Sequence, residues 1–102
     1  MLVKTVFDSG ELTALLSGDI DHHTARTMRL VIDGDIERCR PESLLLDFRR
    51  VRFMDSSGIG LIMGRCRLMQ LCGGRVRLEN IPPTLERLIA LSGVRSLTDE
   101  GR

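Results

Sequence analysis

The first apolar residues of the chain fall in two short runs, residues 2–7 and 12–17, with turn-forming residues between them. This spacing is typical of two antiparallel strands joined by a tight hairpin. The polar stretch that follows, residues 18–24, predicts a loop in which Asp21 or Thr24 is suited to cap the next helix. The chain is therefore expected to begin with a β-hairpin and a connecting loop.

Three later segments carry apolar residues at steps of three and four, which is the spacing of a helix with one buried face. The predicted helices run from Ala25 to Cys39, over residues 59–72, and from Pro83 to a stop at Gly93. The helix over residues 59–72 is unusual because it carries apolar side chains on two faces. One face comprises Ile59, Ile62, Met63, Cys66 and Met69, and the other comprises Leu61, Leu68 and Leu71 around Gly64.

Arg65 and Arg67 separate these two faces. A surface helix needs only one apolar stripe, so the second face has two interpretations. Either a terminal segment or the neighbouring helix covers it, or it is a docking surface where Gly60 and Gly64 let another chain come close. The sequence leaves both open.

Two further strands separate the helices. Residues 43–48 contain three consecutive leucines, which predicts a strand buried on both faces, whereas residues 75–79 alternate and predict one solvated face. A short edge strand is expected at residues 95–97. Right-handed crossovers place the helices mainly on one face of the sheet. The pattern predicts one α/β domain over residues 1–102, with a mixed, mostly parallel sheet of four to five strands.

Composition excludes several classes of function. The net charge is +1 and the three aromatic residues are all Phe, so the chain has neither the charge nor the stacking platform of a nucleic-acid-binding or membrane-surface protein. No apolar run reaches the length of a membrane span. The densest basic group, residues 49–52, is interpreted as a solvated loop, with a partner-facing patch as the alternative.

Cysteine usage indicates a reducing compartment. The chain has three cysteines, an odd number, and shows no signal sequence. We therefore expect reduced thiols and a cytoplasmic location. Cys66 and Cys72 are expected to be core thiols of an apolar helix.

The chemically distinctive stretch is the junction at Asp55-Ser56-Ser57-Gly58, where a strand passes into a helix. Free N–H groups and partial positive charge at a helix start can hold an oxygen or an anion, although Asp55 or Ser56 acting only as a helix cap is the commoner case. The adjacent His22 and His23 lack a third metal ligand. Ser56 has no evident general base, and Gly58-Ile59-Gly60 lacks a third glycine. Neither an enzyme nor a cofactor or metal site is predicted.

Four segments together resemble a bacterial anti-sigma-factor antagonist with a STAS domain. They are Gly18–Ala25, Phe53–Gly60, Gly73-Gly74 and Leu88–Val94, so the resemblance covers nearly the whole chain. The Asp-His-His-Thr-Ala loop is most similar to the sporulation members, which free the forespore sigma factor F. The family usually continues into another helix after Ser-Gly-Val, for which residues 96–102 are too short. A short or missing final helix is therefore expected.

The resemblance implies a phosphorylation switch. A partner that is both anti-sigma factor and serine kinase would phosphorylate Ser56, and a PP2C-type phosphatase would reverse the modification. The unphosphorylated form would bind the kinase and displace the sigma factor. Ser57 is expected to cap and position the helix. The expected partner-binding residues are Asp19, Asp21, His22, Asp55, Ser57, Gly58, Gly60 and Gly64.

Two alternatives keep the same fold. One is a scaffold or interaction domain that is never phosphorylated, and the other is a small nucleotide-binding domain that uses the loop ends near Asp21 and Ser56.

Overall fold

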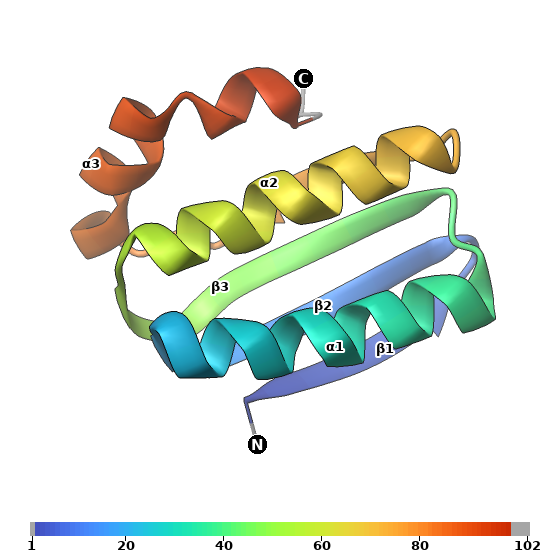
Figure 1. Cartoon of the computed structure of the whole chain (residues 1–102), viewed down its shortest axis with the longest axis horizontal. Coiled ribbons are helices and arrows are strands. Elements are labelled where there is room, and N and C mark those ends of the chain that lie inside the picture. Colours follow the sequence, from blue (N-terminus) through green and yellow to red (C-terminus); the bar gives the residue numbers. More distant parts are fainter. Residues whose placement is uncertain (1, 99–102) are drawn as a thin grey trace.

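The computed structural model describes residues 2–98, in which four strands form one mixed sheet in the order β1-β2-β3-β4 (Figure 1). β1 and β2 pair antiparallel as the predicted hairpin, whereas β2, β3 and β4 run parallel. The predicted mixed, mostly parallel sheet is confirmed. The elements are β1 (Val3–Asp8), β2 (Glu11–Ile20), α1 (His22–Cys39), β3 (Ser43–Met54), α2 (Ser56–Leu71), β4 (Arg75–Glu79), α3 (Pro83–Ser92) and the 3-10 helix η1 (Val94–Leu97).

The central strands β2 and β3 are longer than predicted. Their pairing runs from Glu11 and Ser43 to Ile20 and Met54, with shifts of register on the way. Gly18, at a φ of +83°, lies next to one of these shifts, in a conformation that suits glycine. Residues 18–20, which were expected to be a loop, therefore belong to β2. The backbones of β2 and β3 form hydrogen bonds with each other regardless of their side chains.

The same pairing corrects the interpretation of residues 49–52 as a loop. They belong to β3, and Arg49, Arg50 and Arg52 point into solvent while Val51 is buried. Exposure does not alternate strictly here, because the neighbouring Arg49 and Arg50 are both solvated where the register between β2 and β3 shifts.

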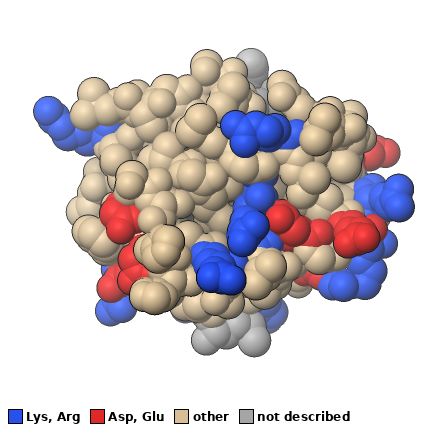
Figure 2. Space-filling view, in the orientation of Figure 1, with Lys and Arg blue, Asp and Glu red and all other residues tan. Residues whose placement is uncertain are grey.

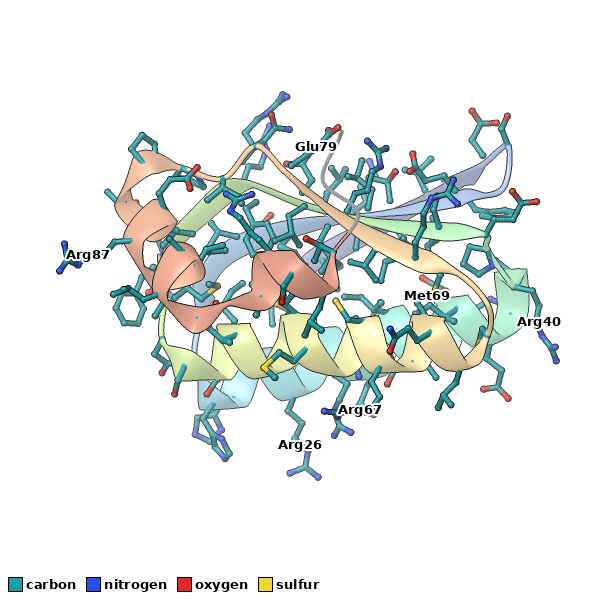
Figure 3. All side chains as sticks on the ribbon, turned by 90° about the horizontal axis from the view of Figure 1, so that it is seen from above. Arg26, Arg40, Arg67, Met69, Glu79 and Arg87 are labelled. Carbon is teal, nitrogen blue, oxygen red and sulfur yellow. The ribbon has the colours of Figure 1, made fainter. Side chains whose placement is uncertain are left out.

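Helices α1 and α2 lie on one face of the sheet, as expected (Figures 1 and 3). In Figure 3, Met69 points from α2 toward the sheet and Glu79 lies on the opposite side of it. α3 packs against β3 and η1, and η1 packs against α2. Among residues 2–98, no helix is long and apolar enough to cross a membrane.

The core lies between the sheet and the helix pair. Each fully buried aliphatic side chain in such a core stabilises the fold by about 1.5–3 kcal/mol. The stripe predicted for α1 is confirmed at its centre, since Met28 and Ile32 are fully buried. Other buried residues are Leu12, Ala14, Leu16, Leu44, Leu46, Phe48, Ile62, Met69, Val76 and Ile89.

The assignment of residues to the two apolar faces of α2 is partly wrong. Met63, assigned to the inner face, is 37% exposed, whereas Leu61 is buried and Leu68 packs against the core. Helix α1 packs against α2, so the neighbouring helix accounts for most of the second apolar face. Leu71 at the end of α2 remains 82% exposed. Arg65 does not separate two surface faces, because it is itself buried.

Two predictions near the chain's end also need correction. Residues 95–97 form part of η1 and not an edge strand, because Gly93 adopts a φ of +79° and the Ser96 N–H donates to its carbonyl. Cys72 is exposed at the end of α2, although Cys66 is buried as expected. The expectation about a final helix falls partly on residues 99–102, outside the described part of the chain.

Candidate functional site

The carboxyl ends of β2 and β3 bring the candidate residues to one edge of the sheet. Ile20 and Met54 are paired there, and the Asp55 N–H donates to the Ile20 carbonyl at 3.2 Å. Asp19 and Asp21 flank Ile20, so both lie beside the start of α2. The carboxyl edge of parallel strands is the usual place for a functional site in open α/β sheets.

Asp55 is the cap of α2. Its carboxylate accepts from the Ser57 N–H at 2.7 Å, and its carbonyl accepts from the Gly58 N–H at 2.9 Å. The capping role predicted for Ser57 therefore belongs to Asp55. The residue that precedes the helix can accept hydrogen bonds from the free N–H groups of the first turn, whereas Ser57 lies within that turn. Ser56 is the first helical residue and is exposed. Within residues 2–98 its hydroxyl makes no hydrogen bond, so it is free to react.

Asp21 caps α1 in the same way, as predicted. Its carboxylate accepts from the N–H groups of His23 and Thr24 at 2.9 and 3.0 Å, and the Thr24 hydroxyl accepts from the Asp21 N–H. The backbone hydrogen bond from Thr24 is the largest of the contacts that lower the pKa of Asp21. The carboxylate is therefore ionised at neutral pH. His22 follows it, exposed at the start of α1.

Asp19 lies at the exposed end of β2. Its Oδ1 is 3.6 Å from Nη2 of Arg52, and both side chains are more than half exposed. Such a pair contributes little to stability, so the two groups stay available for other contacts.

Gly58 lies below the surface, unlike the other candidates. It is buried at the start of α2, and an added Cβ would lie 2.1 Å from Cγ of Met54. Its lack of a side chain lets the first turn of α2 pack directly on the end of β3. Gly58 therefore positions Ser56 and does not itself present a surface.

His22, Ser57, Gly60 and Gly64 line one groove between the N-terminal halves of α1 and α2. The groove has a volume of about 450 Å³. Nothing lies within 4 Å of the position of an added Cβ at Gly60 or Gly64, so both glycines leave open space. The structure thus brings these four predicted residues together, beside the edge that carries Asp19, Asp21, Asp55 and Ser56.

The groove also contains charged residues that the sequence analysis missed. Arg65 is only 5% exposed, and its Nε lies 2.9 Å from Oδ1 of Asp33 on α1. Burial lowers the pKa of the Arg65 guanidinium, while the carboxylate of Asp33 acts in the opposite direction. Arg26 and Arg29 of α1 line the same groove. A signal was present, because Arg65 lies three residues after Ile62 and four before Met69, within the buried stripe.

No cluster of three metal-binding side chains occurs in the part of the chain that the structure describes. What the arrangement offers chemically is an exposed hydroxyl at a helix start, on a sheet edge that also carries three carboxylates, next to a groove with basic residues.

Comparison with known proteins gives consistent matches. The STAS domain model matches residues 4–99. The anti-sigma F factor antagonist of Paenibacillus polymyxa is 39% identical over 85 residues, which cover 83% of this chain and 73% of that protein. The structure of the anti-sigma factor antagonist SpoIIAA in its unphosphorylated form is 29% identical, with a TM-score of 0.83 over 98% of this chain and 88% of that one.

The structure of the Bacillus cell fate determinant SpoIIAA in its phosphorylated form also matches. It has a TM-score of 0.74 and is 29% identical over 98% of this chain and 91% of that one. The fold and the family resemblance predicted from the sequence are both confirmed. The chain therefore belongs to the STAS domain family and groups with its anti-sigma-factor antagonists.

Proposed function

We propose that this protein is a cytoplasmic anti-sigma-factor antagonist that is switched by phosphorylation of Ser56. The unphosphorylated form binds an anti-sigma factor with serine kinase activity, and the sigma factor is released. Phosphorylation of Ser56 by that kinase ends the binding, and a PP2C-type phosphatase restores it. The protein acts by binding and performs no catalysis itself.

The observation that carries this proposal is the exposed, unbonded hydroxyl of Ser56 at the start of α2. A kinase must bring the serine hydroxyl in line with the γ-phosphate of ATP. The hydroxyl must therefore be exposed and must not be held by hydrogen bonds to its own protein. Asp55 supplies the helix cap, so Ser56 has no structural task that modification would disturb. The fold can therefore survive phosphorylation.

The charge added at Ser56 explains how binding stops. A phosphate carries about −1.5 to −2 charges at neutral pH. Asp55 follows the end of β3 and Asp21 lies beside it at the end of β2, so the phosphate joins carboxylates that are already there. A like-charge contact across an interface costs several kcal/mol, and each 1.4 kcal/mol weakens binding tenfold.

The likeness to SpoIIAA supports the same mechanism. Its structure is known in an unphosphorylated and a phosphorylated form, and this chain matches both over 98% of its length. A domain that has one fold in two phosphorylation states is suited to a switch that acts on the surface and not on the core.

The test is incubation with Mg-ATP and the anti-sigma factor kinase encoded in the same genome, followed by peptide mass mapping. We expect one phosphate, on Ser56, and none in the Ser56→Ala variant. Ser57 provides an internal control, because it is the adjacent hydroxyl on the same helix turn. Phosphate on Ser57, or none on either serine while the kinase binds the protein, would contradict the switch; the second result would favour a scaffold that is never phosphorylated.

A further inference from the structure

Arg65 is the buried charge of the α1–α2 groove, and its hydrogen-bonding capacity is not used. Its side chain is 6% exposed, and its ion pair with Asp33 lacks hydrogen-bond geometry although the two atoms are 2.9 Å apart. Among the described residues, Nη1 has no hydrogen-bond partner at all. Buried guanidinium nitrogens are almost always hydrogen-bonded in folded proteins, so Arg65 keeps donor capacity that its pairing with Asp33 does not use.

The groove gives a ligand access to the Arg65 side chain. Gly60 and Gly64 lie one helical turn apart on α2, and neither would meet another atom within 4 Å if it carried a Cβ. Arg65 lines the groove that these glycines leave open. A side chain from outside can therefore enter between the helices and approach the exposed edge of the Arg65 side chain.

The basic side chains around the groove favour a negatively charged ligand. Arg26 and Arg29 line the groove together with Arg65, and the charge of Arg29 is close enough to Arg65 to lower its pKa further. Figure 2 shows basic side chains across the middle of this face, over the line where α1 and α2 meet. Arg26 extends from α1 away from the sheet, into solvent (Figure 3). The one carboxylate paired with Arg65, that of Asp33, lines a separate groove at the other end of the two helices.

We infer that the α1–α2 groove binds a carboxylate side chain, an Asp or a Glu, of the protein partner, with the guanidinium of Arg65 as the donor at its base. Arg26 and Arg29 attract the carboxylate at the rim, and the two glycines admit it. Because Ser57 lines the same groove, the contact fixes the partner directly beside Ser56. The identity of that partner as an anti-sigma factor rests on the function proposed above.

The groove's volume fits this occupant. About 450 Å³ accommodates one or two side chains but not a helix. A carboxylate also matches the planar guanidinium better than a point charge does, since two parallel N–H groups can bind its two oxygens.

The first experiment needs no partner. The 15N-labelled full chain is titrated with N-acetylglutamate N-methylamide, whose only charge is the side-chain carboxylate, and the Arg65 Nε–Hε signal and the amides of Gly60 and Gly64 are followed by NMR. We expect saturable shifts at these positions, with a dissociation constant on the order of millimolar for so small a ligand. N-acetylglutamine N-methylamide, which is neutral and of the same shape, is the control and leaves them unchanged.

Two results overturn the inference at this stage. Equal shifts with N-acetylglutamine N-methylamide, or no shifts in the groove with N-acetylglutamate N-methylamide, would show that no carboxylate site exists. Inorganic phosphate forms the third arm: phosphate binding in the groove without carboxylate binding would replace the proposed partner side chain with a phosphate-bearing ligand.

The second experiment fills the groove without touching its charges. Gly64→Leu places a side chain in the open space between the helices, and Gly34→Leu is the matched control because Gly34 of α1 also has nothing within 4 Å and does not line this groove. Both variants are first checked for a cooperative thermal transition. We expect Gly64→Leu to weaken binding of the anti-sigma factor kinase about 10- to 100-fold, as expected when a charge-assisted hydrogen bond is lost. Gly34→Leu binds as the parent does.

The two experiments separate this inference from the proposed function. If the kinase does not bind the parent protein, the proposed function fails, but the titration still decides whether the carboxylate site exists. If the kinase binds the parent and the Gly64→Leu variant equally, the docking of a partner carboxylate in the groove is excluded while the proposed function stands.

Discussion

Gly58 and Met54 are packed so closely that a single methyl group on Gly58 would lie 2.1 Å from Cγ and 2.3 Å from Sδ of Met54. This contact joins the first turn of α2 to the last residue of β3. It fixes the turn that carries Ser56 against the sheet. The position of the Ser56 hydroxyl therefore depends on a residue that has no side chain.

Gly58→Ala should destabilise the fold, because Met54 is itself 5% exposed and has little room to move. Overpacking of this kind costs about 1–3 kcal/mol. Gly60→Ala is the control, since it lies in the same helix with open space around it and should gain about 0.5–1 kcal/mol from helix propensity. Thermal unfolding measures both, and a Gly58→Ala variant as stable as the parent would show that Met54 yields easily.

The ion pair between Arg65 and Asp33 predicts an asymmetry between two substitutions. Asp33→Ala leaves a 94% buried guanidinium without a charge partner, whereas Arg65→Met leaves a carboxylate whose side chain is one-third exposed. Buried pairs cost about 3–5 kcal/mol when one partner is removed, and the exposure of Asp33 reduces this to about 2–3 kcal/mol. Arg65→Met should cost about 1 kcal/mol, because methionine refills the space. Denaturant unfolding of the two variants gives the order, and a greater loss for Arg65→Met would contradict this account.

The cap of α1 makes stability depend on acidic pH. The folded-state pKa of Asp21 is lowered, chiefly by the backbone N–H of Thr24. Its stabilising effect is therefore fully present above the unfolded pKa of about 3.9, and it is lost as the pH falls through the lower folded pKa. Asn caps a helix as well as Asp does but does not titrate. We expect Asp21→Asn to match the parent near pH 7 and to lose less stability between about pH 5 and pH 2, as measured by denaturant unfolding. Identical pH profiles would exclude this contribution.

The cysteines should differ in reactivity. Cys66 is 4% exposed, and burial raises the pKa of its thiol, while Cys72 is exposed at the end of α2. The thiolate is the reactive form, so both accessibility and ionisation protect Cys66. Iodoacetamide should modify Cys72 in the native protein and Cys66 only after unfolding, as read by mass spectrometry of the peptides. Modification of both at one rate under native conditions would mean that α2 opens readily.

The parts of the fold that the sequence predicted correctly depend on residues that are neighbours along the chain. The three leucines of residues 44–46 and the junction at Asp55 and Ser56 can each be interpreted from a few neighbouring residues. The arginines at 49–52 could not be placed in the same way, because their strand exists through pairing with residues 17–20 of β2, far away in sequence. Local polarity predicted a loop, and the hydrogen bonds of the sheet overrode it.

The same distinction applies to the site. The sequence predicted Ser56 because its motif is contiguous, and it predicted Gly60 and Gly64 because they interrupt an apolar helix. It could not show that Gly58 is buried or that Arg65 reaches Asp33, since both facts depend on how α2 meets β3 and α1. The groove is a product of helix packing, and packing is set by residues from separate segments.

The proposed switch predicts opposite behaviour for two substitutions at Ser56. Ser56→Ala removes only an unbonded, exposed hydroxyl, so the variant should unfold within about 0.5 kcal/mol of the parent and bind the anti-sigma factor kinase constitutively, even after incubation with ATP. Ser56→Asp adds one negative charge near Asp55 and Asp21 and should bind at least about tenfold more weakly, because about 1.4 kcal/mol of like-charge repulsion suffices for that change. Isothermal titration calorimetry gives both affinities, and thermal unfolding shows whether each variant is folded. Gln70→Glu is the control for added charge, because Gln70 is exposed near the far end of α2 and does not line the groove. Equal affinity of the Ser56→Ala and Ser56→Asp variants would contradict the switch, whereas a loss confined to Ser56→Asp would place the charge-sensitive contact at Ser56 itself.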